Sequence, residues 1–373
     1  MTSLTYKSSL DLPPTAIVIG AGIAGASMAR QLAERGIAVT VFERDELASG
    51  GSGNPVAVVR PEPGGEQNPI TELSTTGVSW LMDWISTNAQ SVPHDWCGAF
   101  RIARDQRRHD KLAQQARLLG DACLREVDTV AASNLCGVQP AAGGFFIPQS
   151  GWVRPVALVS AFLDHPLIHV RTRMKVERLH PVKSDAQGRW ELQLSDGSKV
   201  ITACVVLASA FAEGLSPVDL AIDSARGQLS CLPERADRPL HTIVCRDGYI
   251  TPAINGVHTI GATIQYDDDQ ALARPSDDEE NFQRLQRLLP DFASDVSELS
   301  SGRVAWRATT QDRLPLVGKI AEGLFASLGH GSRGVACGPL CAEFLSALIC
   351  AEPLPLGPEW IARLDPLRLV RQH

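Results

Sequence analysis

Three glycines near the start of the chain place the strongest constraint on its fold. Gly20, Gly22 and Gly25 follow the short apolar stretch 16–19 and precede the alanine-rich stretch 23–34. In a strand–turn–helix unit, the first glycine permits the tight turn, the second lets a pyrophosphate approach the backbone, and the third lets helix and strand pack closely. The spacing therefore predicts a strand at 16–19, a helix at 23–34 and a dinucleotide-binding turn between them.

The residues after this helix complete the unit. Gly36 ends the helix, and AVTVFE (38–43) predicts a second buried strand that ends in Glu43. An acid about twenty residues after the glycines accepts hydrogen bonds from ribose hydroxyls, and the helix N-terminus offers free N–H groups to phosphate. The predicted cofactor-binding residues here are Gly20, Gly22, Ile23, Ala24, Gly25, Glu43 and Arg44.

The segment after the second strand distinguishes FAD from NAD. In NAD enzymes this strand usually leads directly into further β–α units. Here it leads into LASGGSGNPVAVVRPEPGGEQNP (47–69), whose Gly, Ser, Asn and Pro residues predict a long stretch without regular structure. The small residues Gly51, Ser52, Gly53 and Asn54 are able to wrap a pyrophosphate, which favours FAD.

The rest of the chain predicts a mixed α/β class (α+β mixed) with two interleaved domains. Helices are expected at 70–90, 106–119, 277–290 and 339–350, and strand meanders over 175–209 and 223–265. We expect a Rossmann-like FAD-binding domain formed by 1–86, 146–222 and 303–373, and an antiparallel-sheet substrate domain formed by 87–145 and 223–302.

Composition narrows the function class and the compartment. The 373 residues carry a formal net charge of −7, which argues against a protein coated in positive potential but allows a local basic patch. The polar N-terminus lacks the apolar core of a signal peptide, and the apolar run 16–29 is too short and glycine-rich to span a bilayer. Nine cysteines without a CxxC pair are typical of free buried thiols. A cytoplasmic protein without a membrane segment or metal site is expected.

These motifs resemble those of the D-amino-acid oxidase superfamily, which includes glycine oxidase and sarcosine oxidase. Within it, the chain is most similar to the FAD-dependent oxidoreductase domain of the bifunctional tRNA 5-methylaminomethyl-2-thiouridine biosynthesis proteins. The matching pieces run in order from residue 16 to 369: IVIGAGIAGA, GSGNP, RGQLS, GYITPA, IGAT, RATTQDRLPLVG, GSRG with PLCAE, and LDPLRL. The early pieces specify only the superfamily, whereas RATTQDRLPLVG and GSRGVACGPLCAE are much narrower.

The resemblance implies that a late glycine loop and the helix after it lie against the flavin. Backbone N–H groups of 329–334 and a helix start at Gly338–Pro339 would face the end of the ring where negative charge grows on reduction. It adds Val176, Gly329, His330, Gly331, Ser332 and Gly334 to the predicted cofactor-binding residues. His330 and Arg333 border the same pocket, where each either touches the substrate or orders the loop.

The resemblance also implies the substrate-binding residues. Arg307 is expected to hold a substrate carboxylate through two parallel hydrogen bonds, Tyr249 to assist it, and Arg333 to complete the predicted catalytic set. No catalytic base is required, because an unprotonated amine gives up its α-hydride once it is correctly placed. Ala308 stands where sarcosine-oxidase relatives attach flavin through cysteine, so non-covalent FAD is expected.

The implied activity is oxidation of the carboxymethylaminomethyl group on a tRNA wobble uridine, with a free amino-acid oxidase or a non-catalytic flavoprotein as alternatives. Two departures from the family bear on it: Ala57 replaces a glycine near the flavin, and no methyltransferase domain is present, so a separate methyltransferase is a possible partner. A basic stretch offers a tRNA contact or is simply a solvated helix face: Arg101, Arg104, Arg107, Arg108, Lys111 and Arg117. The sequence leaves the oligomeric state open.

Overall fold

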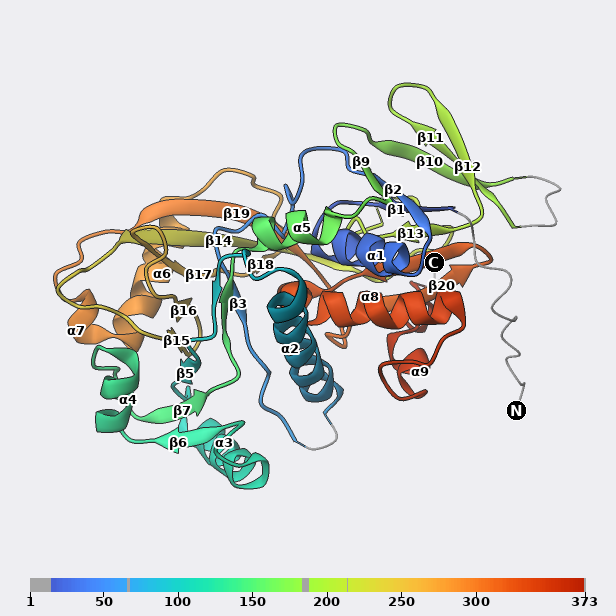
Figure 1. Cartoon of the computed structure of the whole chain (residues 1–373). Coiled ribbons are helices and arrows are strands. Elements are labelled where there is room, and N and C mark those ends of the chain that lie inside the picture. Colours follow the sequence, from blue (N-terminus) through green and yellow to red (C-terminus); the bar gives the residue numbers. More distant parts are fainter. Residues whose placement is uncertain (1–14, 66–67, 183–187, 213, 372–373) are drawn as a thin grey trace. The chain divides into compact units, whose positions relative to one another are not determined.

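The structure, a computed structural model, describes residues 15–65, 68–182, 188–212 and 214–371 (Figure 1). Contacts divide the chain into two compact units. Unit 1 contains residues 1–53, 155–223 and 307–373, and unit 2 contains residues 54–154 and 224–306. The expected domain division placed 54–86 and 146–154 with the nucleotide-binding part, whereas these segments pack within unit 2 because β3 (Ala57–Val59) pairs with β8 (Gly151–Val153). The division into functional domains stays a prediction.

Unit 1 is built on a six-stranded sheet with the order β20-β21-β13-β1-β2-β9. Its parallel strands are β1 (Thr15–Ile19), β2 (Ala38–Phe42), β9 (Ile168–Arg171), β13 (Val205–Leu207) and β21 (Leu324–Leu328), and β20 (Leu316–Ala321) is antiparallel to β21. The helix α1 (Ile23–Glu34) contacts α5 (Pro155–Leu163) and α8 (Gly334–Cys350) (Figure 1). The predicted strand–helix–strand start is confirmed.

The predicted meander of 175–209 forms a small antiparallel sheet in unit 1. It contains β10 (Val176–Pro181), β11 (Trp190–Leu194) and β12 (Lys199–Thr202), and the chain then enters β13. Residues 183–187 of this predicted meander lie outside the described residues. The C-terminal part of the unit adds α9 (Trp360–Leu364) and the 3₁₀ turn Pro366–Arg368, with the Trp360 side chain fully buried.

The last long helix begins five residues earlier than predicted. A 3₁₀ turn at Gly331–Arg333 leads into α8 at Gly334, and Pro339 lies inside the helix rather than at its start. A proline there removes one backbone hydrogen bond. The buried face of α8 compensates through packing, because Gly334 and Gly338 both lie against the side chain of Ile23 at the start of α1.

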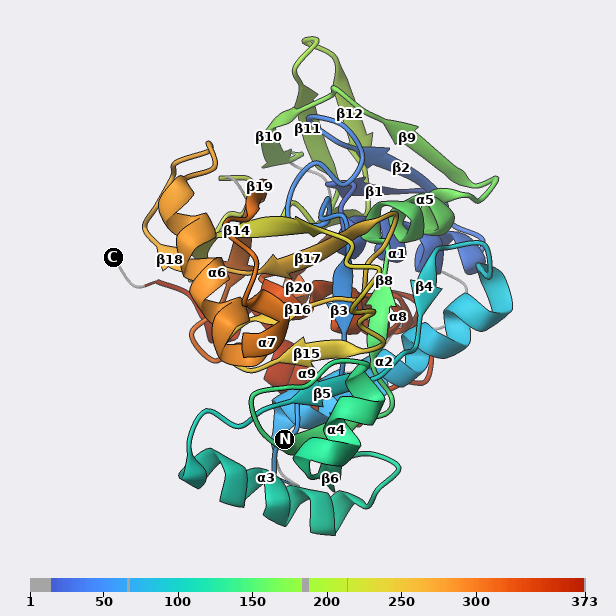
Figure 2. The same ribbon diagram turned by 90° about the vertical axis from the view of Figure 1, so that its left-hand side faces the viewer.

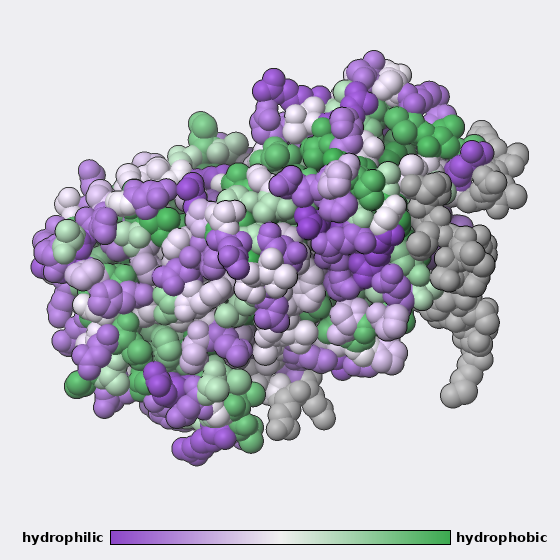
Figure 3. Space-filling view, viewed as in Figure 1, coloured by the Kyte–Doolittle hydropathy of each residue, from purple (hydrophilic) through white to green (hydrophobic). Residues whose placement is uncertain are grey.

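Residues 331–350 are also the one stretch of the described chain long and apolar enough to cross a membrane by length and composition. Two-thirds of its most apolar window is buried within the protein, as in the core helix of a globular fold. Hydrophilic residues prevail on the face of the molecule drawn in Figure 3.

Unit 2 contains a large, mostly antiparallel sheet with the order β18-β14-β17-β16-β15-β5-β7-β6, and β19 pairs with β14. The bounds are β5 (Ala99–Arg101), β6 (Arg125–Val127), β7 (Gly144–Ile147), β14 (Asp223–Pro233), β15 (Ile243–Cys245), β16 (Tyr249–Ile250), β17 (Val257–Gly261), β18 (Gln265–Tyr266) and β19 (Ser300–Thr309). A second, small sheet joins β3, β8 and β4 (His94–Asp95). The strand β3 therefore interrupts the long segment that was predicted to lack regular structure. The predicted class, a parallel nucleotide-binding sheet combined with an antiparallel sheet, is confirmed.

Five helices accompany the sheets of unit 2 in its described residues. They are α2 (Pro69–Asn88), α3 (Gln106–Leu119), α4 (Thr129–Cys136), α6 (Pro275–Leu288) and α7 (Pro290–Ala293). Figure 2 shows α6 alongside β14, β16 and β17. A buried polar network ties this helix to β14: Arg226 is fully buried and donates to Asp277, while Asp278 accepts from Gln228 and Ser230.

His258 on β17 makes the stability of unit 2 sensitive to acid. Its side chain is fully buried beside Phe292, and its Nδ1 hydrogen-bonds the Thr251 carbonyl. Burial lowers the pKa of His258 below its usual 6.5. Below about pH 6.5 the unfolded chain binds a proton at this histidine that the folded chain does not bind. The contribution of the neutral His258 to the stability is therefore complete above about pH 6.5 and is lost as the pH falls below that value.

We predict that His258→Leu removes part of this acid sensitivity. The lost hydrogen bond costs the same at every pH, so the measured quantity is the change in unfolding free energy between pH 7.5 and 5.5. That change should be smaller in the variant by at most about 1.4 kcal/mol. Urea titrations at both values test this, with His180→Leu, which replaces an exposed histidine of β10, as the control. Equal pH dependence in the variant and the wild type contradicts the assignment.

Candidate functional site

The predicted cofactor-binding segments of unit 1 follow the carboxyl ends of neighbouring parallel strands. The glycine turn follows β1, Glu43 follows β2, Ser209 comes soon after β13, and the loop 329–333 follows β21. Parallel strands end at the same edge of a sheet, which is where open α/β sheets bind their ligands. Segments three hundred residues apart in sequence therefore meet at one edge of one sheet.

The glycine turn has no room for side chains. An added Cβ at Gly25 would stand 1.8 Å from the carbonyl oxygen of Gly20, and one at Gly20 would stand 2.7 Å from the carbonyl oxygen of Ala208. Gly20 also has a φ of 108°, which favours glycine. The turn can therefore bring the N-terminus of α1 to the sheet edge only with glycines at these positions.

Glu43 is anchored beside this turn. One carboxylate oxygen accepts a hydrogen bond from the N–H of Ala21 at 2.8 Å, and the other accepts from the N–H of Asp45 at 3.0 Å. Each oxygen keeps a further lone pair with which it can accept from a ribose hydroxyl. Arg44, also predicted to bind cofactor, is exposed and pairs with Asp45 at 3.1 Å.

Ser52 caps α1 from the second small-residue loop. Gly22 is the N-cap residue and has no side chain to cap the helix, and the Ser52 hydroxyl accepts from the N–H of Ile23 at 2.9 Å. The Ile23 N–H, predicted to face phosphate, is therefore used within the protein. The N–H groups of Ala24 and Gly25 remain in the first turn, where the helix provides no carbonyl to accept them. Gly53 closes a turn onto the carbonyl of Gly50, and Gly51 lies within the same turn.

Two observations test whether this edge fits FAD. The glycine turn is a cradle that side chains would fill, and the buried hydroxyl of Ser209 has no hydrogen-bond partner among the described residues. Ser209 stands directly beside Gly20, since an added Cβ on Gly20 would lie 3.0 Å from the Ser209 Cα. The donors and acceptors present here fit a dinucleotide. Ser209 was not predicted, although the small residues that follow the buried strand VVL (205–207) were a usable signal.

The late glycine loop places a neutral histidine near both helix starts. The Ser327 hydroxyl hydrogen-bonds His330 Nε2 at 3.0 Å, and Nδ1 is buried without a partner among the described atoms. Burial lowers the pKa of His330 to about 4. Gly329 and Gly331 have φ values of 67° and 57°, so the tight path of the loop requires glycine at both.

The remaining residues predicted from the late loop are accounted for individually. Ser332 is exposed, Gly334 begins α8, and Val176 has its side chain buried in the core with Ile17 and Phe42. Because α8 starts at Gly334, the free N–H groups belong to its first turn, 334–336, and not to a helix start at Gly338 as predicted. Pro339 has no backbone N–H and therefore cannot donate a hydrogen bond.

The predicted substrate residues are half-buried. In unit 1, Arg307 lies on β19, the side chain of Ala308 beside it is buried, and Arg333 donates to the Arg313 carbonyl at 2.5 Å. In unit 2, Tyr249 begins β16, where it pairs with Gly261. Asn54 accepts a hydrogen bond from Arg303 at 3.1 Å, and burial lowers the pKa of Arg303. The sequence gives no local signal for this contact of Arg303, because it joins residues 249 positions apart.

The basic stretch is less uniform than its sequence indicates. Arg101 pairs with Glu62 at 3.1 Å, and Arg108 is half-buried. The exposed cations of the stretch are Arg104, Arg107, Lys111 and Arg117.

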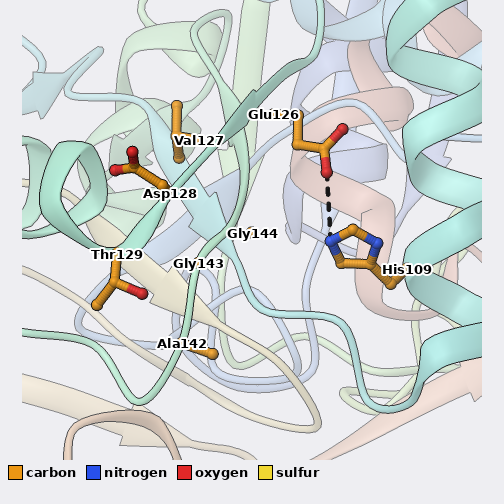
Figure 4. A pocket seen from close by; sticks show the side chains of 8 residues that line it. All are labelled: His109, Glu126, Val127, Asp128, Thr129, Ala142, Gly143 and Gly144. Carbon is orange, nitrogen blue, oxygen red and sulfur yellow. Dashed lines mark ion pairs between the residues drawn. The ribbon is translucent and has the colours of Figure 1, made fainter.

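A hollow of about 510 Å³ lies beside α3 (Figure 4). The ion pair between His109 and Glu126 crosses it at 3.4 Å, and Asp128 and Thr129 also line it. None of the predicted cofactor or substrate residues lines this hollow.

Comparison with known proteins finds relatives along nearly the whole chain. The chain is 34% identical over 397 residues to the tRNA 5-methylaminomethyl-2-thiouridine biosynthesis bifunctional protein MnmC of Chromobacterium violaceum, and 32% identical over 392 residues to that of Pseudomonas entomophila. These alignments cover 95% and 94% of this chain but 59% of each relative. The chain thus spans about three-fifths of the length of these curated relatives.

Solved structures share the fold at low sequence identity. Glycine oxidase from Geobacillus kaustophilus has a TM-score of 0.82 at 20% identity, covering 97% of this chain and 99% of that one. Iminodiacetate oxidase from Chelativorans sp. BNC1 has a TM-score of 0.76 at 20% identity, covering 94% and 98%.

The profile of a single family spans nearly all of the described chain. Residues 15–348 match the family described as FAD dependent oxidoreductase, and this range contains the glycine turn, Glu43 and the late loop. The chain therefore belongs to the FAD-dependent oxidoreductases of the D-amino-acid oxidase family, and is homologous to the FAD-dependent part of the bifunctional MnmC proteins.

Proposed function

We propose that the protein removes the carboxymethyl group from 5-carboxymethylaminomethyl-(2-thio)uridine at the wobble position of tRNA. The observation that carries the proposal is 34% identity over 95% of the chain to a protein named for biosynthesis of 5-methylaminomethyl-2-thiouridine in tRNA. The narrow motifs RATTQDRLPLVG and GSRGVACGPLCAE support the same substrate. The product is a 5-aminomethyl uridine, which would still require methylation to become the 5-methylaminomethyl uridine.

The reaction balances as a two-electron oxidation followed by hydrolysis. Hydride leaves the methylene carbon between the amine and the carboxylate, the amine nitrogen loses its proton, and a C=N double bond forms. Water then adds to this imine, and the C–N bond breaks to give glyoxylate and the primary amine. FAD, when bound, accepts the hydride.

The chain's own residues have two tasks in this proposal, binding the substrate carboxylate and holding the cofactor. Arg307 grips the substrate carboxylate through two parallel hydrogen bonds, and Tyr249 donates a third. The first-turn N–H groups of α1 and α8 hold the negative parts of the cofactor. No side-chain base is assigned, because the amine reacts unprotonated. We propose that FAD is held without a covalent bond, since Ala308 provides no thiol.

Free amino-acid oxidation is the second candidate. The fold shared with glycine oxidase favours it, but at 20% identity that similarity shows only the fold. Glycine, sarcosine or a D-amino acid would use the same carboxylate grip. The experiments below separate the two substrates.

We predict that the purified protein is yellow and that acid precipitation releases intact FAD into the supernatant. The reason is that Ala308 occupies the position of the linking cysteine. Absorbance and chromatography of the supernatant provide the measurement. Flavin that stays with the denatured pellet would exclude non-covalent binding.

We predict that Arg307→Lys lowers substrate-dependent flavin reduction by roughly ten- to hundredfold, while FAD content stays normal. An ammonium cannot reproduce the planar two-bond grip, and a hydrogen bond to a charged group is worth about 1.5–3 kcal/mol. Stopped-flow reduction by modified tRNA measures the effect, and Arg313→Lys is the matched control on the same segment. Unchanged reduction in Arg307→Lys would remove this residue from the site.

We predict that replacing Arg104, Arg107 and Arg108 together by Gln weakens tRNA binding and flattens its salt dependence. Each lost phosphate contact lowers the slope of log K against log salt by about one unit. The control changes three exposed cations of unit 1 by the same charge: Lys175, Arg178 and Lys199 to Gln. Rapid reduction by glycine, with no effect of modified tRNA in the wild type, would instead favour the amino-acid oxidase.

A further inference from the structure

Two large apolar side chains of unit 2 are exposed to solvent on a segment whose backbone is fixed by hydrogen bonds. Ile264 and Tyr266 are 57% and 60% exposed, and they flank Gln265 on and just before β18. A single exposed apolar residue needs no explanation. Two on one short segment, at the edge of the sheet that also carries the predicted substrate residue Tyr249, indicate a contact surface.

The strand geometry places Tyr266 on the same face of the sheet as Tyr249. Gln265 hydrogen-bonds Asp277 of α6 at 3.0 Å, so Tyr266, the next residue of β18, points to the face opposite α6. On β16, Ile250 packs with Leu285 and Leu288 of α6, so Tyr249 also points away from α6. The side chains of Tyr249 and Tyr266 therefore share the face of the sheet that α6 does not cover.

Buried groups fix the backbone of this segment. Arg226 donates to the carbonyls of Gln270 at 2.6 Å and Leu272 at 2.8 Å, while its Nη1 pairs with Asp277 at 2.6 Å. Trp306 donates to the Asp268 carbonyl at 2.8 Å. Burying an arginine is costly unless it is paired, and such groups can serve to specify one conformation. The exposed side chains thus project from a preorganised backbone, which lowers the entropic cost of binding.

We propose that Tyr266 is a specificity-determining residue that stacks on the uracil ring of the substrate, with Ile264 completing the apolar surface. This inference rests on the proposed function. Exposed aromatic side chains on rigid backbone are the usual platform for an unstacked base. Glycine and sarcosine have no flat ring, and their recognition would not require such a platform.

The charges around Tyr266 select the ring rather than the backbone of the nucleotide. Asp267 and Asp269 are exposed, and Asp268 is paired with Arg274 at 2.6 Å. Two exposed carboxylates repel phosphate, so the sugar–phosphate chain would be bound elsewhere. The uracil ring carries no charge and offers an N–H donor that a carboxylate accepts.

The test uses two small probes that lack phosphate: the nucleoside 5-carboxymethylaminomethyluridine and sarcosine. The holoenzyme variants are Tyr266→Ala and Tyr266→Phe, with Val257→Ala as a control that removes another exposed apolar side chain of the same sheet. We expect Tyr266→Ala to weaken nucleoside binding by about 5- to 150-fold, seen as a raised KM, and to leave sarcosine turnover unchanged. Tyr266→Phe keeps the ring and should bind the nucleoside like the wild type.

The outcomes separate this inference from the proposed function. If the nucleoside reduces the flavin of the wild type and of Tyr266→Ala equally well, the stacking role alone is overturned. An equal loss on both probes with unchanged FAD content also overturns it, because it indicates a structural effect. If sarcosine reduces the flavin of the wild type but neither the nucleoside nor modified tRNA does, the proposed function and this inference are overturned together.

Discussion

The contact between Gly25 and the carbonyl of Gly20 is the constraint on which unit 1 depends. With no Cβ at either glycine, the chain reverses within a few residues and α1 packs directly on the strand it follows. That packing brings the first turn of α1 to the carboxyl edge of the sheet. Ser52 and the N-terminal turn of α8 are then positioned by Ile23, the first residue of α1, through its backbone N–H and its side chain respectively. A methyl group at Gly25 would displace the helix and with it both partners.

Unit 2 depends on a different interaction, the buried pair of Arg226 and Asp277. A buried ion pair contributes little net stability compared with apolar packing, but losing one partner leaves an uncompensated charge. Its main effect here is geometric. The guanidinium joins a strand, a helix and two carbonyls of the segment 265–274, a segment rich in polar residues that has little apolar packing of its own.

The sequence predicted the elements that have a regular hydrophobic period or a turn that needs glycine. The strand–helix–strand start, the helices near 70–90 and 106–119 and the meander all follow from local period and turn residues. The start of α8 did not, because the proline rule favours a helix beginning at Pro339, whereas packing against Ile23 extends the helix backwards. The capping of Ile23 by Ser52 was also hidden, since it joins residues 29 positions apart. Long-range pairs such as Arg101 with Glu62 likewise depend on the tertiary fold.

The two helix N-termini at the sheet edge favour negative charge through backbone groups alone. Two helix N-termini, of α1 and α8, reach this edge, and each carries partial positive charge on its free N–H groups. His330 lies beside both, yet burial lowers its pKa to about 4, so it is neutral at physiological pH. Arg333, the nearest cation in the loop sequence, donates to the carbonyl of Arg313. These backbone dipoles do not titrate, so their contribution to the stabilisation of an anion at the sheet edge stays constant across the neutral pH range.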